Sequence, residues 1–414
     1  MRRALLIVLV LVCLTGQASA AVPVIVQLGP LTNVNLIAQL LGGTVLDSVP
    51  GVNVHLLSLP ALPILSQFQL SLLGIVSIEV DKVIEVGFAP RSGVLTVPAQ
   101  TAPDWYRNQP SMQLIGTSLA LNYSTGAGIV IADINAKVDY GHPVLAGHLT
   151  SGYDFVDSRA GYASTLNQSS SSFLDQSSSS FLDQSSSSFL DQSSSSFLDQ
   201  NVADLLDNGN PALSHGTLCA GIIAAVAPQS AIMPLRVFDD SGAADVFSIT
   251  RAVYYAVQNG AQVINMSFGL DSSYKAVQAA VSYALNANVT VVASAGNANT
   301  SVAQYPAAYS GVISVAATDN ADRKASFSNF GNSVTVVAPG VNIISTFPGG
   351  YYAVASGTSF SAPIVAAEAA LVRSVKMGSA KVIISGTATN VDHLNPGYGG
   401  KLGTGRINVL AAVQ

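Results

Sequence analysis

The sequence predicts an α/β protein with a doubly wound, mostly parallel sheet, preceded by a small α+β domain. Hydrophobic residues make up 49% of the 414 residues and charged residues only 10%, as expected for a large buried core. From residue 115 onward, short apolar runs typical of buried strands alternate with runs of helical length. This alternation is the pattern of a parallel sheet covered by helices.

A different order of elements precedes this region. Residues 22–86 predict the order βαββαβ, which matches the split βαβ sandwich. A unit this small has a thin core, so we expect it to be marginally stable alone. The predicted domain covers residues 21–90. Its expected strands span 22–28, 44–49, 52–59 and 75–86, and its expected helices span 31–41 and 62–73.

The N-terminus has the three parts of a secretory signal peptide. Arg2-Arg3 form the charged part, residues 4–14 the apolar part, and Ala18-Ser19-Ala20 a small-residue cleavage site. The apolar run is too short to span a bilayer comfortably, and an uncleaved anchor is the alternative. We therefore predict a signal peptide over residues 1–20, a secreted, extracellular protein, and no membrane association after signal removal.

Two segments lack the pattern of packed elements. Residues 87–110 contain four prolines and no apolar periodicity, so we predict a linker and place it at 91–110. Within the larger domain, expected at 111–414, the octad Gln-Ser-Ser-Ser-Ser-Phe-Leu-Asp occurs four times over 168–199. Its serine content predicts an expanded surface loop. An adhesive or calcium-stacking array is the alternative, which one Asp per unit and the lack of a Gly turn disfavour.

Charge and cysteine content limit the partners. The net charge is −6, and it would be −2 without the four aspartates of the repeat. Such a balance gives no electrostatic reason to bind nucleic acid or an anionic membrane. Cys13 lies in the predicted signal peptide, so its removal would leave Cys219 without an intramolecular disulfide partner.

A candidate nucleophile lies in the small-residue turn 356–363. Ser359 follows Gly357-Thr358 and precedes residues 364–372, an apolar run typical of a buried helix. The glycine allows a sharp turn, and a helix N-terminus places free N–H groups and positive dipole beside the hydroxyl. A substrate oxyanion could bind there, although small residues before a helix are also common caps.

Three further motifs supply the groups that such a serine needs. His215 begins an expected helix, and a neutral imidazole can accept a hydroxyl proton. Asp133 ends an expected strand, 129–133, where catalytic groups gather in parallel sheets. Asn297 follows another strand and offers a side-chain amide. Each has a structural alternative as a cap, a satisfied histidine or a turn, but the chain order Asp, His, Ser is that of subtilisin.

With these motifs, the segment from about residue 105 to 414 resembles a subtilisin-like serine protease outside the repeat and its flanks. Residues 22–86 resemble the inhibitory propeptide of that family more loosely, by element order and position. The motifs that carry the resemblance are Asp139-Tyr140-Gly141-His142-Pro143, His215-Gly216-Thr217, Asn265-Met266-Ser267-Phe268-Gly269, Ser294-Ala295-Gly296-Asn297, Gly357-Thr358-Ser359 and Gly403-Thr404-Gly405.

The resemblance implies a role for each candidate. Ser359 would attack the peptide carbonyl, His215 would accept its proton, and Asp133 would hold the imidazole in the right tautomer. The Asn297 amide and the Ser359 N–H would stabilise the oxyanion. The expected substrate-binding residues, of which the first three would pair with the substrate backbone, are Ser267, Phe268, Gly269, Ser294, Ala295 and Gly296.

The sequence departs from the family pattern at three places. Ile134-Asn135 follow Asp133 where the family usually has Ser or Thr and then Gly, which bears on rate more than on fold. Leu218 replaces a common histidine outside the triad. Residues 222–228 continue without the calcium-binding insertion of many relatives, so we predict no calcium site there. No metal or other cofactor is implied.

Cys219, four residues after His215, occupies a position where some family members carry a cysteine. Its ordinary interpretation is a small buried hydrophobe. If that position lies close to the base, a bulky mercurial on Cys219 is expected to disturb His215.

These features predict a secreted serine endopeptidase made as an autoinhibited precursor. Its partners would be protein or peptide substrates and its own propeptide, released by cleavage between about Gly87 and Trp105. Two alternatives stay open. One is a catalytically impaired scaffold that binds peptides, and the other is a surface adhesion protein whose working part is the repeat.

Overall fold

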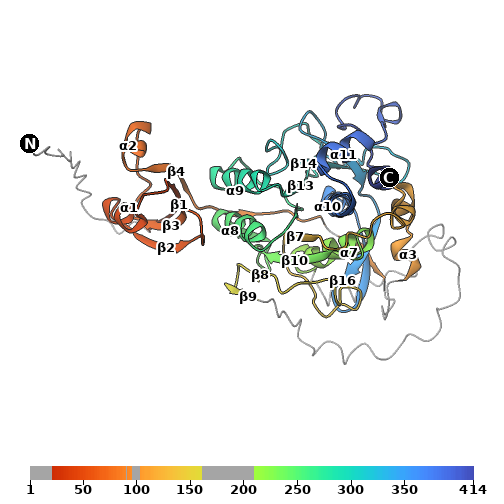
Figure 1. The fold of residues 1–414 in the computed structure, drawn as a ribbon, viewed down its shortest axis with the longest axis horizontal. Helices are drawn as coiled ribbons and strands as arrows, with labels where there is room; N and C mark the ends of the chain where they lie inside the picture. The colour runs from red at the N-terminus through yellow and green to blue at the C-terminus, as the bar shows by residue number, and fades with distance from the viewer. Residues whose placement is uncertain (1–20, 90, 96–102, 161–208) are drawn as a thin grey trace, which may run out of the picture. The chain divides into compact units, whose positions relative to one another are not determined.

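The computed structural model describes residues 21–89, 91–95, 103–160 and 209–414 (Figure 1). The predicted signal peptide and the octad repeat lie outside the described residues. The chain forms two compact units that divide between Asp81 and Lys82, ahead of the predicted boundary at residue 90. Every helix in the described ranges is too short or too polar to cross a membrane.

The smaller unit has the predicted order βαββαβ. Its elements are β1 (Val22–Leu28), α1 (Val34–Leu40), β2 (Thr44–Ser48), β3 (Val54–Leu59), α2 (Gln67–Leu72) and β4 (Ile75–Val80). The antiparallel sheet has the strand order β2-β3-β1-β4. Polar caps begin both helices: Asn33 accepts backbone N–H bonds of α1, and Ser66 and Gln69 form a capping box on α2.

The prediction of one strand over 75–86 was wrong. Asp81 and Lys82 interrupt the apolar run, and β4 ends just before them. The chain then continues as β5 (Val83–Glu85), which pairs antiparallel with β11 (Ala243–Asp245) in the larger unit. The predicted linker likewise contains a strand, β6 (Arg91–Leu95).

The larger unit contains the predicted doubly wound sheet, in the order β15-β14-β13-β12-β7-β10-β8-β9. The strands from β15 to β8 run parallel, and β9 joins β8 antiparallel. The bounds are β7 (Val130–Asn135), β8 (Tyr153–Asp154), β9 (Arg159–Ala160), β10 (Ala231–Arg236), β12 (Val263–Met266), β13 (Thr290–Ser294), β14 (Ile313–Thr318) and β15 (Val336–Pro339).

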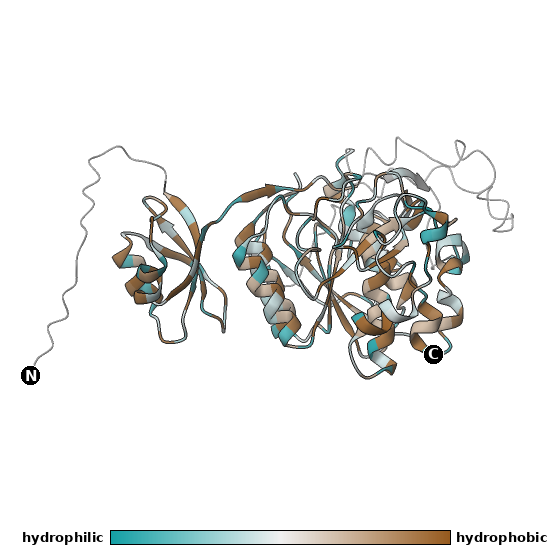
Figure 2. Ribbon diagram, turned by 90° about the horizontal axis from the view of Figure 1, so that it is seen from above, coloured by the Kyte–Doolittle hydropathy of each residue, from teal (hydrophilic) through white to brown (hydrophobic). Residues whose placement is uncertain are grey.

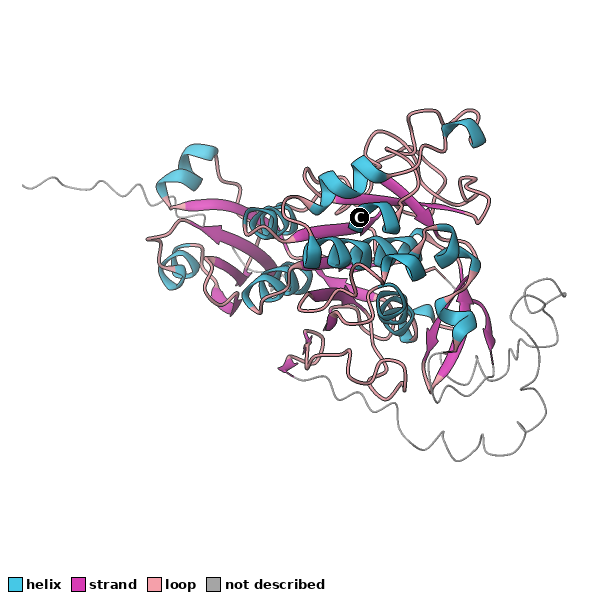
Figure 3. Ribbon diagram, turned by 45° about the vertical axis from the view of Figure 1, so that its right-hand side comes forward, coloured by secondary structure: helices cyan, strands magenta, loops and turns pink. Residues whose placement is uncertain are grey.

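Helices cover both faces of this sheet. In Figure 1, α8 (Val246–Gln258) and α9 (Lys275–Asn286) lie on one side of the strands, and α7 (His215–Val226) and α10 (Thr358–Val375) lie on the other. Figure 3 shows the strands of the sheet between these helices. Many of the strands are brown, the hydrophobic colour, in Figure 2, and every residue of β12 to β15 is buried. Near-continuous apolar strands are typical of parallel sheets buried on both faces.

Smaller elements complete the unit. Strand β6 joins a three-stranded sheet in the order β16-β17-β6, of which β16 spans Ile343–Phe347 and β17 spans Tyr351–Ala355. The remaining helices are α3 (Asp104–Arg107), α4 (Pro110–Leu114), α5 (Thr117–Ala120), η3 (Pro211–Leu213), α11 (Ala380–Thr387), η4 (Asp392–Leu394) and α12 (Val409–Val413).

Candidate active site

Ser359 is the second residue of α10 and is 5% exposed. The turn before it is extended at Gly357, whose N–H donates to the Gly340 carbonyl at 2.8 Å. The N–H groups in the first turn of a helix have no intrahelical acceptor, and the helix dipole places positive charge there. Ser359 therefore has the environment that was predicted for a nucleophile.

Asn297 lies beside this turn and its amide is oriented by Thr358. Its Oδ1 accepts from the Thr358 N–H and from the Thr358 hydroxyl, both at 2.9 Å. Thr358 Oγ1 in turn accepts from the Gly296 N–H at 3.1 Å. With Oδ1 occupied in this way, Nδ2 of the exposed Asn297 points away from Thr358, near Gly357, and has no hydrogen-bond acceptor among the described residues. This is the arrangement expected of an oxyanion donor.

His215 begins α7 and is fully buried. Burial lowers the pKa of the imidazole to about 3, so the ring is neutral at pH 7. Its Nδ1 lies 2.7 Å from Asn135 Oδ1, whereas its Nε2 is buried without a hydrogen-bond partner among the described residues. A neutral imidazole with a free ring nitrogen can act as a base.

The structure corrects the expected contact between Asp133 and His215. Asp133 lies two residues before the end of β7, and its carboxylate accepts from Asn265 Nδ2 at 2.7 Å and from Asn135 Nδ2 at 3.3 Å. Burial raises the pKa of Asp133 to about 6, although both amide donors act in the opposite direction. The residue that contacts His215 is Asn135, the last residue of β7.

The physical reason for this correction is the length of β7. Side chains two residues apart in a strand point to the same face, so Asp133 and Asn135 lie on the same face of β7. The strand continues to Asn135 instead of ending at Asp133, and its last side chain is the nearer one. A sequence signal for Asn135 existed, because catalytic groups gather at the carboxyl end of a parallel strand.

Cys219 packs against the first turn of α10, which carries Ser359. Its thiol lies 3.5 Å from the Ser359 carbonyl and 3.8 Å from His215 Nδ1. Pro363, four residues after Ser359, has no N–H, so that carbonyl lacks its usual helical donor. The thiol donates in its place. Burial raises the pKa of Cys219 well above its usual value, so the thiol stays protonated and can donate.

A segment of the chain itself lies against these groups. After β5, the Val86 N–H donates to the Gly242 carbonyl at 3.0 Å. The Phe88 ring then stacks on His215 with 4.3 Å between ring centroids. Ala89 follows directly against Gly357, where a side-chain carbon would come within 2.7 Å of it. Residues 82–89 therefore cover the imidazole and the nucleophile turn.

The predicted substrate-binding residues are largely buried. Ser267 accepts from Asn265 Nδ2 at 2.9 Å, and Phe268 packs edge-on against Phe238. Ser294 and Ala295 are buried at the end of β13. Gly269 and Gly296 both face the Gln304 side chain; Gly296 has φ +104°, and a side-chain carbon there would lie 1.8 Å from Gln304 Oε1. Neither Gln304 nor the edge of β11, which pairs with β5, had a signal in the sequence. The expected pairing of residues 267–269 with substrate stays a prediction.

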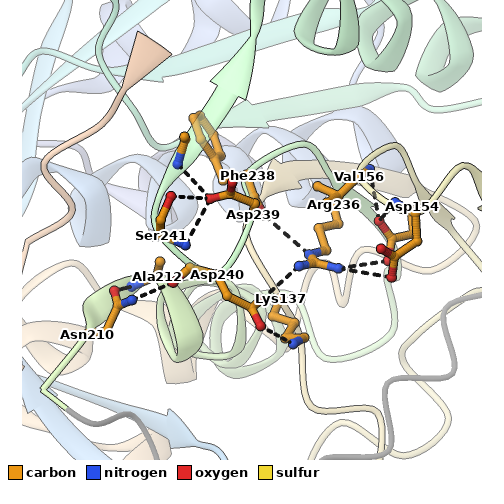
Figure 4. A network of polar contacts seen from close by, with 12 residues as sticks. Lys137, Asp154, Val156, Asn210, Ala212, Arg236, Phe238, Asp239, Asp240 and Ser241 are labelled. Carbon is orange, nitrogen blue, oxygen red and sulfur yellow. Dashed lines mark hydrogen bonds and ion pairs between the residues drawn. The ribbon is translucent and has the colours of Figure 1, made fainter. Parts of the chain in front are cut away.

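A separate polar network lies at the end of β10 (Figure 4). Arg236, 8% exposed, donates to Asp154 at 3.0 Å and to Asp240 at 2.8 Å. Lys137 also contacts Asp240, at 2.8 Å. Across the described ranges, no three His, Cys, Asp or Glu side chains gather closely enough to hold a metal ion. The expected lack of a calcium site at the uninterrupted helix α7 stays a prediction.

Comparisons with known proteins agree with the fold and with the family resemblance. The profile of the subtilase family (Peptidase_S8) matches residues 126–395. Thermitase of Thermoactinomyces vulgaris is 35% identical over 324 residues, covering 75% of this chain and 98% of thermitase. A thermophilic serine proteinase of Bacillus sp. strain AK1 is 36% identical over 310 residues, covering 72% of this chain and 65% of that protein.

A solved structure is similar over almost the whole chain. Fervidolysin from Fervidobacterium pennivorans, a keratinolytic enzyme related to subtilisin, matches with a TM-score of 0.71 and 24% identity. The match covers 97% of this chain and 62% of the fervidolysin chain. At this identity the likeness concerns the fold, and the family follows from the sequence matches. The chain belongs to the subtilase family of serine endopeptidases.

Proposed function

We propose that this endopeptidase cleaves peptide bonds with Ser359 as nucleophile and His215 as general base. The Asn297 amide and the Ser359 N–H would bind the oxyanion, each donor of this kind contributing about 10²–10³ in turnover. No hydrogen bond joins His215 Nε2 to Ser359 in the structure. Catalytic hydrogen bonds of this kind are often long before substrate binds and then tighten.

The observation that carries this proposal is the position of residues 82–89. An extended peptide pairs antiparallel with β11, as peptides do when they add to the edge of a sheet. It brings Phe88 against the proposed base and Ala89 against the nucleophile turn. This contact supports peptide backbone as the ligand of these elements, and protein or peptide substrates would follow the same path. Gly269 and Gly296 would help to form the pocket for the substrate side chain.

The same segment supports synthesis as an autoinhibited precursor. While Phe88 covers His215 and Ala89 covers Gly357, a substrate cannot approach either group. The N-terminal unit would act as the propeptide, and cleavage between about Gly87 and Trp105 would release it. Export by the predicted signal peptide would make the mature enzyme extracellular.

The experiment compares the full chain with a Ser359→Ala variant, and uses Ser356→Ala as a matched control. Ser356 accepts the Asn342 N–H and has no place in the proposed chemistry. We expect the wild type and the control to lose the N-terminal unit and to react with a fluorophosphonate probe. The Ser359→Ala protein should remain full-length and unlabelled. Normal processing of that variant in a protease-free translation system would overturn the proposal.

The scaffold and adhesion hypotheses make different predictions. A peptide-binding scaffold would leave the wild type unlabelled by fluorophosphonate, because only an activated serine reacts readily. For the adhesion hypothesis, deletion of residues 168–199 would abolish adhesion and leave proteolysis unchanged. An asparagine in contact with His215 would lower the rate, as the scaffold hypothesis requires. The Asp133 carboxylate, 3.3 Å from the Asn135 amide, acts in the opposite direction.

A further inference from the structure

We infer that the acid of the catalytic triad is divided between two residues. Asn135 contacts His215, and Asp133 is a positioning residue that fixes the Asn135 amide, so that His215 keeps its proton on Nδ1. The inference rests on the proposed function of His215 as base. It assigns a role to a residue pair instead of the single aspartate that the sequence suggested.

The hydrogen bonds of Asn135 determine which way its amide faces. Oδ1 lies 2.8 Å from the Ala136 N–H, a group that can only donate. Nδ2 lies 3.3 and 3.4 Å from the two oxygens of Asp133, which accept when the carboxylate is ionised. Both ends of the amide therefore require the same orientation, in which Oδ1 faces His215.

This orientation selects the tautomer of the imidazole. Because Asn135 Oδ1 can only accept, the His215 Nδ1 that lies 2.7 Å from it must carry the proton. Nε2 then has no proton and is free to accept one from Ser359. The reverse orientation would present Nδ2 to the ring and move the proton to Nε2. Asparagine in place of a triad aspartate typically costs about 10⁴ in turnover, because the wrong tautomer forms.

Asp133 is itself held in place by the neighbouring strand. Asn265 is its register partner on β12 and donates to it at 2.7 Å. The same Asn265 amide contacts Ser267 at 2.9 Å. The carboxylate is fully buried and its hydrogen-bond donors are neutral amides. The Asn135 amide thus separates its negative charge from the imidazole, and none of the described residues places a cation in contact with it.

The test uses a set of four proteins: the wild type, Asp133→Asn, Asn135→Asp and the exchange that combines both. In Asp133→Asn, the new amide keeps its oxygen toward Asn265, so its nitrogen faces Asn135 Nδ2. Two donors then oppose each other, which favours reversal of the Asn135 amide, whereas the Ala136 N–H still favours the original orientation. We expect kcat/KM to fall at least about tenfold, toward the 10⁴ seen for a wrong tautomer.

The protein that combines Asp133→Asn with Asn135→Asp tests for rescue of activity. A merely structural role of Asp133 would not predict such rescue. The exchange places a carboxylate directly on His215 Nδ1 and an amide behind it, so we expect activity at or above the wild-type level. Asn135→Asp alone should fall below the exchange, because two carboxylates in contact cannot both ionise readily. An exchange protein that folds but is no more active than Asp133→Asn would overturn the inference.

A second readout is independent of activity. In Ser359→Ala proteins labelled with ¹⁵N-histidine, two-bond ¹⁵N–¹H spectra report the tautomer of His215, assigned from a His215→Gln spectrum. We expect Nδ1–H in the wild-type background and a population of at least about half Nε2–H with Asp133→Asn. Asp154→Asn, at another fully buried aspartate, should keep Nδ1–H. An unchanged tautomer with Asp133→Asn would overturn the inference.

The two readouts separate this inference from the proposed function. If the wild type fails to react with a fluorophosphonate, the proposed function fails, while the tautomer measurement still decides the role of Asp133. If the wild type reacts and Asp133→Asn keeps both its rate and its tautomer, the proposed function stands and the inference fails.

Discussion

Asp133 and Asp154 are two aspartates of the larger unit, both fully buried, in opposite electrostatic surroundings. Asp154 pairs with the Arg236 guanidinium at 3.0 Å, with Arg159 at 3.8 Å as a second cation. Asp133 has two amides as its hydrogen-bond donors and no ion pair with any described residue. The charge of Asp154 is neutralised by Arg236, whereas Asp133 is stabilised only by the dipoles of two neutral amides.

The difference shows what each carboxylate can do. A buried ion pair fixes two segments together, and removal of one partner leaves the other charge uncompensated. A cation beside Asp133 would oppose the positive charge that forms on His215 when it takes a proton. Amide donors orient the carboxylate without neutralising its charge. The first arrangement suits a structural role and the second suits a place next to a base.

The largest expected effect comes from breaking the ion pair. Arg236→Met leaves Asp154 buried without its main partner, so we expect a loss of about 4 kcal/mol in the free energy of unfolding. Arg159→Met is the matched control, because Arg159 is 47% exposed and should cost at most about 1 kcal/mol. Urea unfolding of Ser359→Ala proteins measures both. Equal losses in the two variants would contradict this assignment.

The next effect is a pH dependence at Asp133. Its pKa is raised by burial from 3.8 to about 6, so the folded state holds a proton that the unfolded state has already lost. Stability from this group is complete below pH 4 and is lost as pH rises through about 6. Relative to Asp133→Asn, which does not titrate, the unfolding free energy should fall by about 3 kcal/mol across this range. Urea unfolding at several pH values measures it, and parallel curves would contradict it.

The smallest effect concerns the imidazole itself. Burial lowers the pKa of His215 to about 3, so its contribution to stability is present above pH 6.5 and is lost as pH falls toward 3. Phe88→Ala exposes the ring, and the pKa should rise by at least about one unit because desolvation weakens. NMR titration of the ring protons in Ser359→Ala protein measures this. Phe68→Ala, at a side chain 77% exposed, is the control and should leave the titration unchanged.

Sequence patterns predicted the elements that depend on local periodicity. The helix that begins at His215 and the apolar helix after Ser359 were placed correctly, as were the element order of the smaller unit and the parallel sheet. These elements follow from runs of apolar residues and from their boundaries. The family motifs then assigned Ser359, His215 and Asn297 to one region, where the structure places Asn297 beside the turn of Ser359.

What the sequence left open depended on distances between segments. Asp133 was predicted as the partner of His215 because it is the acidic residue of the strand. The contact between Asn135 and His215 depends on how β7 and α7 pack together, which the sequence does not show. The pairing of β5 with β11 joins segments far apart in the chain, for which no periodicity exists. The contact between Gln304 and Gly296 is a further case, since no local sequence pattern around either residue predicts it.

The pairing of β5 affects how strongly the segment that follows it is held over His215. The segment that covers His215 is anchored on both sides, by β5 on β11 and by β6 on β17. While the chain is intact, the covering peptide is present at the millimolar effective concentration of a short tether. If the chain is cut between the two strands as proposed, this intramolecular contact would become an encounter between two molecules in solution. Dilution, which acts on a free peptide but not on a tethered one, would then favour the open enzyme.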